Sequence, residues 1–178
     1  MVDKVTIRRF IKNSKVYMSP LYIEQASRHI TTNLERHPRF ISAQRICIFN
    51  ALHDEPQTLG LIERWASVKE IYLPVIRDGI IVLSKFISRE LLQSGLYNIK
   101  EPMSDDLLSE YNTLDLIVIP GVAFDINGGR IGRGKGYYDV LLANPQFKDV
   151  YKIGLCFAFQ KFEKLPTQAH DIRVDEVI

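Results

Sequence analysis

Hydrophobic and polar positions along the first part of the chain follow the period of amphipathic helices. Ile7, Phe10 and Ile11 recur at helical spacing within Asp3–Val16, which predicts a first helix with these side chains facing inward. Ser19-Pro20 is typical of a second helix start, because serine caps the free N–H groups and proline fits the first helical position. The apolar stripe of this second helix consists of Ile23, Ala26, Ile30 and Leu34, and the helix should end before Pro38.

Short apolar runs, typical of strands covered on both faces, then alternate with further helical segments. The predicted strands are Arg45–Asn50, Glu70–Pro74, Gly79–Ile87, Leu114–Pro120 and Tyr151–Phe157. Helices are predicted from Asp54 onward (with Leu59, Ile62, Trp65 and Ala66 inward), over Ser88–Gln93 and over Gly136–Ala143. This alternation predicts an α/β fold: one domain over residues 1–178, three-layer α/β/α, with a mainly parallel, Rossmann-like sheet.

Composition and charge exclude several classes of protein. A net charge of +2 over 178 residues is too small to make nucleic acid the main partner. The most apolar stretch, Leu114–Phe124, is too short to span a bilayer, and the N-terminal residues lack the apolar core of a signal peptide. Cys47 and Cys156 lie inside apolar runs and are expected to be buried, reduced thiols. We therefore expect a cytoplasmic protein without a membrane partner, as a monomer or a weak dimer.

Two loops are expected to meet at one edge of this sheet. Ligands of parallel α/β sheets bind beyond the carboxyl ends of the strands. The segment Asn50–Glu55 and the loop after Pro120 both begin at such ends. Their side chains are therefore candidates for one shared site.

The loop after Pro120 carries the strongest chemical signal in the chain. Gly132, Gly134 and Gly136 alternate with cations, and glycine lets backbone N–H groups approach an oxyanion closely. The cations are Arg130, Arg133 and Lys135, and the following helix brings Tyr137, Tyr138 and Asp139. This order predicts a polyphosphate pocket, with Asp139 available to a Mg²⁺ ion that bridges phosphate oxygens.

Common nucleotide-binding motifs do not describe this loop. Gly129–Lys135 has P-loop spacing, but Gly136 stands where a P-loop has serine or threonine. The dinucleotide pattern fails as well, because Tyr137 occupies the place of its last glycine. The alternative without a function is a solvated glycine turn with exposed cations. The order of strand, cationic glycine loop, tyrosines and carboxylate favours phosphate binding instead.

Beyond this chemistry, the loop resembles the signature of the 5-formyltetrahydrofolate cyclo-ligase family. The matching motifs are Pro120–Asp125 and Gly129–Asp139. Further landmarks agree in order over nearly the whole chain: Lys4 with Arg8, Asp54-Glu55, Ile99–Pro102, Leu165-Pro166 and His170–Asp175.

The resemblance implies a set of site residues. ATP would lie against Lys4, Arg8, Arg130, Ile131, Gly132, Arg133, Gly134, Lys135, Gly136, Tyr137 and Tyr138. The folate would contact Asn50, Glu55 and Arg133–Tyr137, although relatives often carry an apolar residue at the Asn50 position. Mg²⁺ would bind Asp139 and Asp171. Lys135, Arg130 and Arg133 would be the catalytic cations on the phosphate oxygens.

By the same resemblance, the activity is an ATP- and Mg-dependent ring closure on a reduced formyl-folate. The family converts 5-formyltetrahydrofolate and ATP into 5,10-methenyltetrahydrofolate, ADP and phosphate. Two other functions stay open from the sequence alone. One is a folate or nucleotide sensor on the same scaffold, against which the intact Lys135 and Asp139 argue. The other is an RNA-binding domain, since Gly132–Tyr138 mixes cations with aromatics, but the chain lacks a wider basic stripe.

Overall fold

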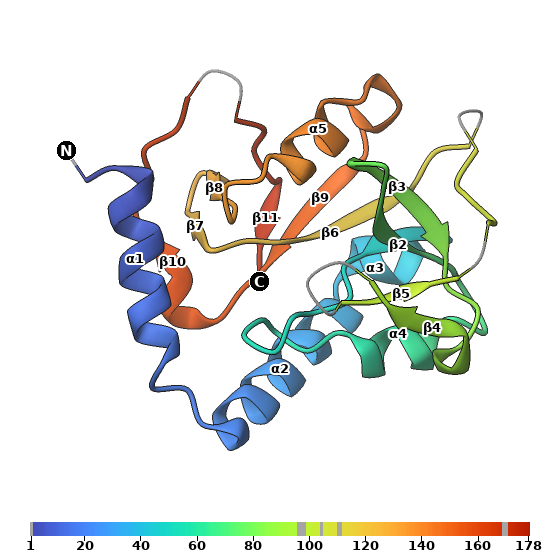
Figure 1. Cartoon of the computed structure of the whole chain (residues 1–178), viewed down its shortest axis with the longest axis horizontal. Coiled ribbons are helices and arrows are strands. Elements are labelled where there is room, and N and C mark those ends of the chain that lie inside the picture. The colour runs from blue at the N-terminus through green and yellow to red at the C-terminus, as the bar shows by residue number, and fades with distance from the viewer. Residues whose placement is uncertain (1, 96–98, 104, 110–111, 169–170) are drawn as a thin grey trace.

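The computed structural model describes residues 2–95, 99–103, 105–109, 112–168 and 171–178 (Figure 1). The helices of this part of the chain are α1 (Lys4–Lys15), α2 (Pro20–Glu35), α3 (Pro38–Ser42), α4 (Leu59–Trp65) and α5 (Tyr137–Ala143). Short 3₁₀ turns lie at Arg89–Leu91, Pro145–Phe147 and Ala158–Gln160.

The main sheet has the strand order β11-β9-β6-β1-β2-β3. Its strands are β1 (Arg45–Ile48), β2 (Glu70–Arg77), β3 (Ile80–Lys85), β6 (Leu116–Pro120), β9 (Tyr151–Leu155) and β11 (Glu176–Val177). Every neighbouring pair is parallel except β2 and β3, which form an antiparallel hairpin. The predicted mainly parallel sheet is therefore confirmed.

Smaller sheets surround the main one. A small sheet beside α1 has the order β10-β7-β8, with β7 (Ala123–Asp125), β8 (Arg130–Ile131) and β10 (Lys161–Phe162). Strands β4 (Leu92–Ser94) and β5 (Lys100–Pro102) pair antiparallel. These short strands were not predicted, because two or three residues carry no readable period.

Side chains of the parallel strands alternate between the two faces of the main sheet, and each face has its own helix layer. On one face, Ile46 and Val118 pack with Leu34 of α2 and Ile62 of α4. On the other face, Cys47 and Ile117 pack with Leu141 and Leu142 of α5. Figure 1 shows α5 on the opposite side of the sheet from α2. The three-layer α/β/α prediction is confirmed.

Helix α1 covers the small sheet instead of the main one. Ile7 and Ile11 are buried against Val122 and Ile131. Phe10, which the sequence pattern places on the inward face, is 57% exposed and meets the Phe162 ring in an edge-on arrangement, with ring centroids 6.4 Å apart. The inward prediction for Phe10 was wrong: Ile7 and Ile11 form the buried stripe of α1 on the small sheet, and Phe10 lies outside it.

Both helix starts at the N-terminal end of the chain are capped. The Asp3 carboxylate accepts from the Thr6 N–H at 2.7 Å, and the Ser19 hydroxyl accepts from the Tyr22 N–H at 3.1 Å. The Ser19-Pro20 signal thus marks the true start of α2.

Two predicted helices differ from the structure. The helix expected from Asp54 begins only at Leu59, because the residues before it form a loop in which the Thr58 hydroxyl donates to the Phe49 carbonyl at 2.6 Å. The segment Ser88–Gln93 is not a helix: it contains one 3₁₀ turn and then enters β4, where pairing with β5 satisfies the backbone. The helix predicted over Gly136–Ala143 is confirmed as α5, with Gly136 as its N-cap.

No helix in the parts of the chain that the structure describes is long and apolar enough to cross a membrane.

Candidate functional site

The two loops that were expected to share an edge do meet there. Strands β1 and β6 are parallel neighbours, with Ile48 opposite Val118, so their carboxyl ends lie side by side. The loop after β1 carries Asp54 and Glu55, and the chain beyond β6 carries Arg133. Ion pairs between these side chains join the two segments across about 80 residues of sequence.

Arg133 is held between two carboxylates. Its Nη2 donates to Asp54 Oδ1 at 2.6 Å and to Glu55 Oε1 at 2.9 Å, and its Nε donates to Glu55 Oε1 at 3.1 Å. The Glu55 side chain is only 8% exposed, whereas the Arg133 side chain is half-exposed. A buried carboxylate and a solvent-facing guanidinium thus meet at the mouth of the site.

Lys15, at the end of α1, completes this charge cluster. Its Nζ donates to Asp54 Oδ2 at 3.0 Å and to the Asp54 carbonyl at 2.5 Å, and the Lys15 side chain is 9% exposed. Two cations and two carboxylates therefore compensate one another in a partly desolvated cluster, which we call the loop-bridging cluster: Lys15, Asp54, Glu55 and Arg133.

The pKa values in the loop-bridging cluster reflect this compensation. Burial alone would raise the pKa of Asp54, but the hydrogen bonds and charges of Arg133 and Lys15 together hold it below its usual value. Burial lowers the pKa of Lys15, and the Asp54 charge opposes that shift only in part. For Arg133, burial works toward a lower pKa, and the charges of Glu55 and Asp54 outweigh it and raise the pKa. The ionised form of Asp54 is thus favoured in the cluster.

Arg130 forms the buried side of the glycine loop. Its side chain is 4% exposed, and its Nη2 donates to Asp139 Oδ1 at 2.6 Å. The guanidinium carbon lies 5.7 Å from the centre of the Tyr138 ring. Within the described residues, the Nε of Arg130 is the only buried side-chain nitrogen or oxygen without a hydrogen-bond partner. Such an orphaned donor is costly in a folded protein unless a ligand satisfies it.

Glycine is required at two positions of this loop. Gly134 has φ +97° and Gly136 has φ +75°, in the left-handed region that residues with a Cβ avoid. Space is not the constraint at Gly136, because a Cβ added there would have no neighbouring atom within 4 Å. The backbone turn itself, which leads into α5, explains the glycines at positions 134 and 136.

Helix α1 brings the predicted pair Lys4 and Arg8 to the same region, but to different partners. Arg8 Nε donates to the Gly132 carbonyl at 2.8 Å, so Arg8 lies against the glycine loop. Lys4 Nζ instead contacts both oxygens of Asp171, at 2.6 and 2.7 Å. Of these two predicted phosphate-binding cations, Arg8 therefore contacts the glycine loop and Lys4 contacts Asp171, a predicted metal ligand.

The other predicted site residues differ in whether their side chains are free to contact a ligand. Lys135 is exposed and makes no ion pair with the described residues, so its ammonium group is available to a ligand. Ile131 is buried under α1, and its carbonyl accepts from the Val122 N–H at 2.7 Å, which leaves its side chain out of reach of solvent. Asn50 donates to the Lys100 carbonyl at 2.7 Å, so part of its hydrogen-bonding capacity already holds β5.

Tyr137 and Tyr138 open α5, both partly buried. Tyr138 packs against both core clusters of the main sheet, and burial raises the pKa of its hydroxyl. A structural role is thus clear for Tyr138, while its ring also forms one wall beside Arg130.

Sequence reasoning missed two residues that shape the site. Asp125 is buried and accepts from the N–H groups of Asn127 and Gly129 and, with its other oxygen, from that of Leu165. The run Asp125-x-Asn127-Gly128 was a signal for such an Asx-type turn. Lys15 gave no signal, because a lysine in the last turn of a helix is ordinary.

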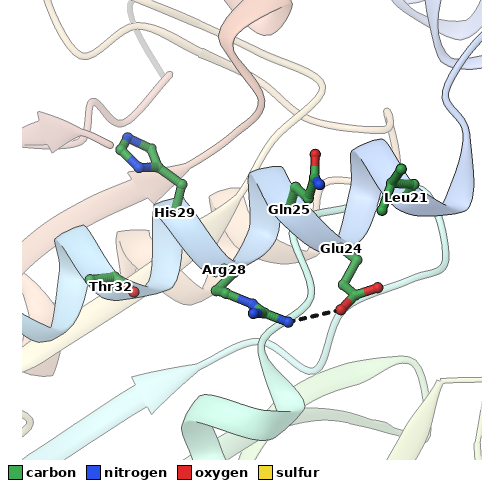
Figure 2. Close-up of a pocket in the computed structure, with 6 residues that line it drawn as sticks. All are labelled: Leu21, Glu24, Gln25, Arg28, His29 and Thr32. Atoms are coloured by element: carbon green, nitrogen blue, oxygen red, sulfur yellow. Dashed lines mark hydrogen bonds and ion pairs between the residues drawn. The ribbon is translucent and has the colours of Figure 1, made fainter.

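Two surface hollows lie along α2. A hollow of about 980 Å³ runs between α2 and α4, and His53 and Gln57 of the loop after β1 belong to its lining. Figure 2 shows a second hollow whose six lining residues all come from α2, with the Arg28–Glu24 ion pair along its edge. A hollow formed by one helix has no opposing wall, so we assign no ligand to it.

The described residues contain no cluster of three or more histidine, cysteine or acidic side chains that could hold a metal ion. His170, which the sequence places next to Asp171, lies outside the described residues. The cysteines are buried as expected; Cys47 lies in β1 and Cys156 directly after β9.

The fold and the site together define an α/β protein with a mainly parallel sheet and a cationic glycine loop beyond the carboxyl ends of its strands. The model of the 5-formyltetrahydrofolate cyclo-ligase family matches residues 1–178. The chain therefore belongs to this family, and it is an enzyme of the ligase class.

Individual relatives agree with this assignment. The chain is 33% identical over 161 residues to 5-formyltetrahydrofolate cyclo-ligase of Mus musculus, covering 84% of this chain and 79% of the relative. It is 30% identical over 175 residues to the Escherichia coli K12 cyclo-ligase, covering 94% and 95%. The solved structure of Aquifex aeolicus 5,10-methenyltetrahydrofolate synthetase has a TM-score of 0.86 and 31% identity, covering 98% of this chain and 88% of that one.

Proposed function

We propose that this enzyme uses Mg-ATP to close a ring on 5-formyltetrahydrofolate, producing 5,10-methenyltetrahydrofolate, ADP and phosphate, and that it works in the cytosol. The observation that carries the proposal is the contact between Arg133 and Glu55 at 2.9 Å. Arg133 belongs to the expected phosphate loop and Glu55 to the expected folate segment. Transfer of a phosphoryl group requires both substrates to bind side by side, and this contact supports such an arrangement.

The chemistry explains why a phosphate-binding loop serves a ring closure. A formamide oxygen is a poor leaving group, so N10 of the folate cannot displace it directly. Attack of that oxygen on the γ-phosphorus breaks the bond to ADP and converts the oxygen into a phosphate ester. N10 then adds to the activated formyl carbon and loses its proton, and the carbon–oxygen bond breaks to release phosphate. The methenyl bridge remains as a cation.

In this reaction the protein binds, orients and neutralises charge. Arg130, Arg133 and Lys135 bind the phosphate oxygens, with backbone N–H groups of residues 132–138. The orphaned Nε of Arg130 supports this role, since a phosphate oxygen would give it the acceptor that it lacks. Arg8, already on the Gly132 carbonyl, and Lys4 add positive charge from α1.

The folate lies against the loop after β1. Glu55 accepts from the polar edge of the pterin with Oε1, the oxygen that faces Arg133 in the ligand-free protein. Its other oxygen accepts from the Leu52 N–H at 3.1 Å, which holds the carboxylate in place during that exchange. Asn50 and residues 133–137 complete the contact.

The acidic residues fit a magnesium ion that is bound mainly through phosphate. Mg²⁺ commonly takes one or two carboxylates and completes its shell with phosphate oxygens and water. Asp139 and Asp171 supply such oxygens, and each already faces a cation at 2.6 Å, Arg130 and Lys4 respectively. The ion would neutralise charge on the transferring phosphoryl group.

One assay separates the proposal from its rivals. Purified protein is mixed with Mg-ATP and 5-formyltetrahydrofolate, and the methenyl chromophore is followed by absorbance. The proposal predicts ATP-dependent formation of the chromophore. A sensor would bind a ligand without turnover, and an RNA-binding domain would do neither; either result would overturn the proposal.

Lys135→Ala tests the role of the loop lysine. Because Lys135 is exposed and makes no ion pair with the described residues, its removal should abolish turnover and leave the circular dichroism spectrum unchanged. Lys148→Ala, which removes another exposed lysine beyond α5, is the matched control and should retain activity. Retained activity in Lys135→Ala would remove the lysine from its proposed role.

A further inference from the structure

The loop-bridging cluster is balanced only while Arg133 stays on its carboxylates. Lys15 and Arg133 supply two positive charges, and Asp54 and Glu55 supply two negative ones. Under the proposed function, on which this inference rests, Arg133 must leave both carboxylates to reach the phosphate oxygens of ATP. Leaving a carboxylate partly buried and uncompensated opposes that step.

The two carboxylates differ in what holds them after Arg133 leaves. Glu55 keeps the hydrogen bond from the Leu52 N–H, and its freed oxygen faces the incoming folate. Asp54 has no proposed ligand, but it keeps Lys15, whose Nζ binds both its carboxylate and its carbonyl oxygen. Because the Lys15 side chain is nearly buried, its attraction to Asp54 is screened less by solvent and salt than that of an exposed lysine.

We propose that Lys15 is a positioning residue that compensates Asp54 and thereby releases Arg133 to bind ATP. Lys15 touches neither substrate. It lowers the cost of moving Arg133 from the carboxylates to the phosphates, so it sets the affinity for ATP and not the rate of the chemical steps. The cluster thus couples the end of α1 to the glycine loop through charge balance.

Steady-state kinetics of Lys15 variants test this role. In Lys15→Met, the unpaired Asp54 retains Arg133, and the KM for ATP should rise about tenfold while kcat stays within about twofold. Lys15→Arg keeps the charge and should restore the KM for ATP. Lys12→Met makes the same change at an exposed position of α1 and should leave both constants unchanged.

A double variant separates charge balance from simple anchoring of the loop. Lys15→Met with Asp54→Asn removes one charge of each sign, so the KM for ATP should return close to that of the unmodified enzyme. If Lys15 only anchors the loop, the double variant should be as impaired as Lys15→Met or more so, which would overturn the inference. A kcat loss in Lys15→Met without a change in the KM for ATP would also overturn it.

Direct binding distinguishes this inference from the proposed function. Calorimetric titration of the unmodified protein with Mg-ATP comes first, and absence of binding there would contradict the proposed function itself. With binding established, an unchanged dissociation constant for ATP in a Lys15→Met protein of native circular dichroism would contradict the role of Lys15 alone.

Discussion

At the scale of residues, the site is defined by which charges compensate one another. Arg133 faces Asp54 and Glu55, Arg130 faces Asp139, and Lys4 faces Asp171. Each charged residue that we expect on the phosphates or the metal, Lys135 excepted, thus has an internal partner of opposite charge or a loop carbonyl. These pairs hold the side chains in place in the ligand-free protein, and substrates must exchange with them.

The lowered pKa of Asp54 predicts a pH-dependent contribution to stability. A carboxyl group whose pKa is depressed in the folded state stabilises it above its ordinary pKa, 3.8 for Asp54, and this contribution is lost as the pH falls through the lower, folded value. The difference in the free energy of unfolding between the unmodified protein and Asp54→Asn should therefore be constant near neutral pH and shrink below pH 3.8.

Urea unfolding of both proteins over an acidic pH series measures this difference. Asp115→Asn is the control. It removes a carboxylate that accepts hydrogen bonds from backbone N–H groups, and so measures the contribution to stability of a carboxylate that does not pair with Lys15 or Arg133. A difference for Asp54→Asn that does not change with pH would mean that the Asp54 charge does not stabilise the fold.

Single site residues could be predicted from the sequence where a charged residue follows a predicted parallel strand. Glu55 and Arg133 could be expected together because both follow parallel strands at the same edge, and the structure brings them within 2.9 Å. Lys15 could not be expected, since its part in the cluster depends on where the end of α1 meets a loop about 40 residues away. Sequence spacing carries no information on that contact.

At the scale of elements, the turn from the glycine loop into α5 positions Tyr137, Tyr138 and Asp139. Gly136 is the N-cap of α5 and has no side chain that could cap the helix. Its left-handed backbone conformation sets the direction in which α5 leaves the loop. Asp139 then reaches back to Arg130 from the first turn of the helix. The geometry of the site thus depends on one backbone conformation.

Gly136→Ala should destabilise the protein through backbone strain. A Cβ at this position meets open space, so the cost is that of the left-handed conformation, about 1–2 kcal/mol in the free energy of unfolding. Gly136→Asn should cost less, because asparagine tolerates this region better. Urea unfolding of the two variants measures the order, and equal stability of Gly136→Ala and the unmodified protein would contradict this account.

Elements with a clear period were predictable, and those fixed by tertiary contacts were not. Caps and apolar stripes located α2, α5 and the central strands. The short strands β7, β8 and β10 exist because they pair with one another under α1, and the segment Ser88–Gln93 became a turn and a strand because β5 pairs with it. Local propensity does not contain these pairings.

At the scale of the whole molecule, α1 and the C-terminal segment close around the glycine loop. Arg8 holds the loop carbonyl of Gly132, Lys4 holds Asp171, and Lys15 holds Asp54, so one helix contacts three separate segments of the site. Phe124 joins the small sheet beneath α1 to the main sheet, because its ring packs directly on Gly154 and leaves no room there for a Cβ.

The central claim is that the glycine loop and its cations bind the triphosphate of ATP next to the folate segment. The most direct measurement is a crystal structure of the protein with Mg²⁺ and a non-hydrolysable ATP analogue. The account predicts the triphosphate against residues 130–138, with the Arg130 Nε bound to a phosphate oxygen and Arg133 released from Asp54 and Glu55. A triphosphate bound elsewhere, with Arg133 still on its carboxylates and the loop empty, would contradict it.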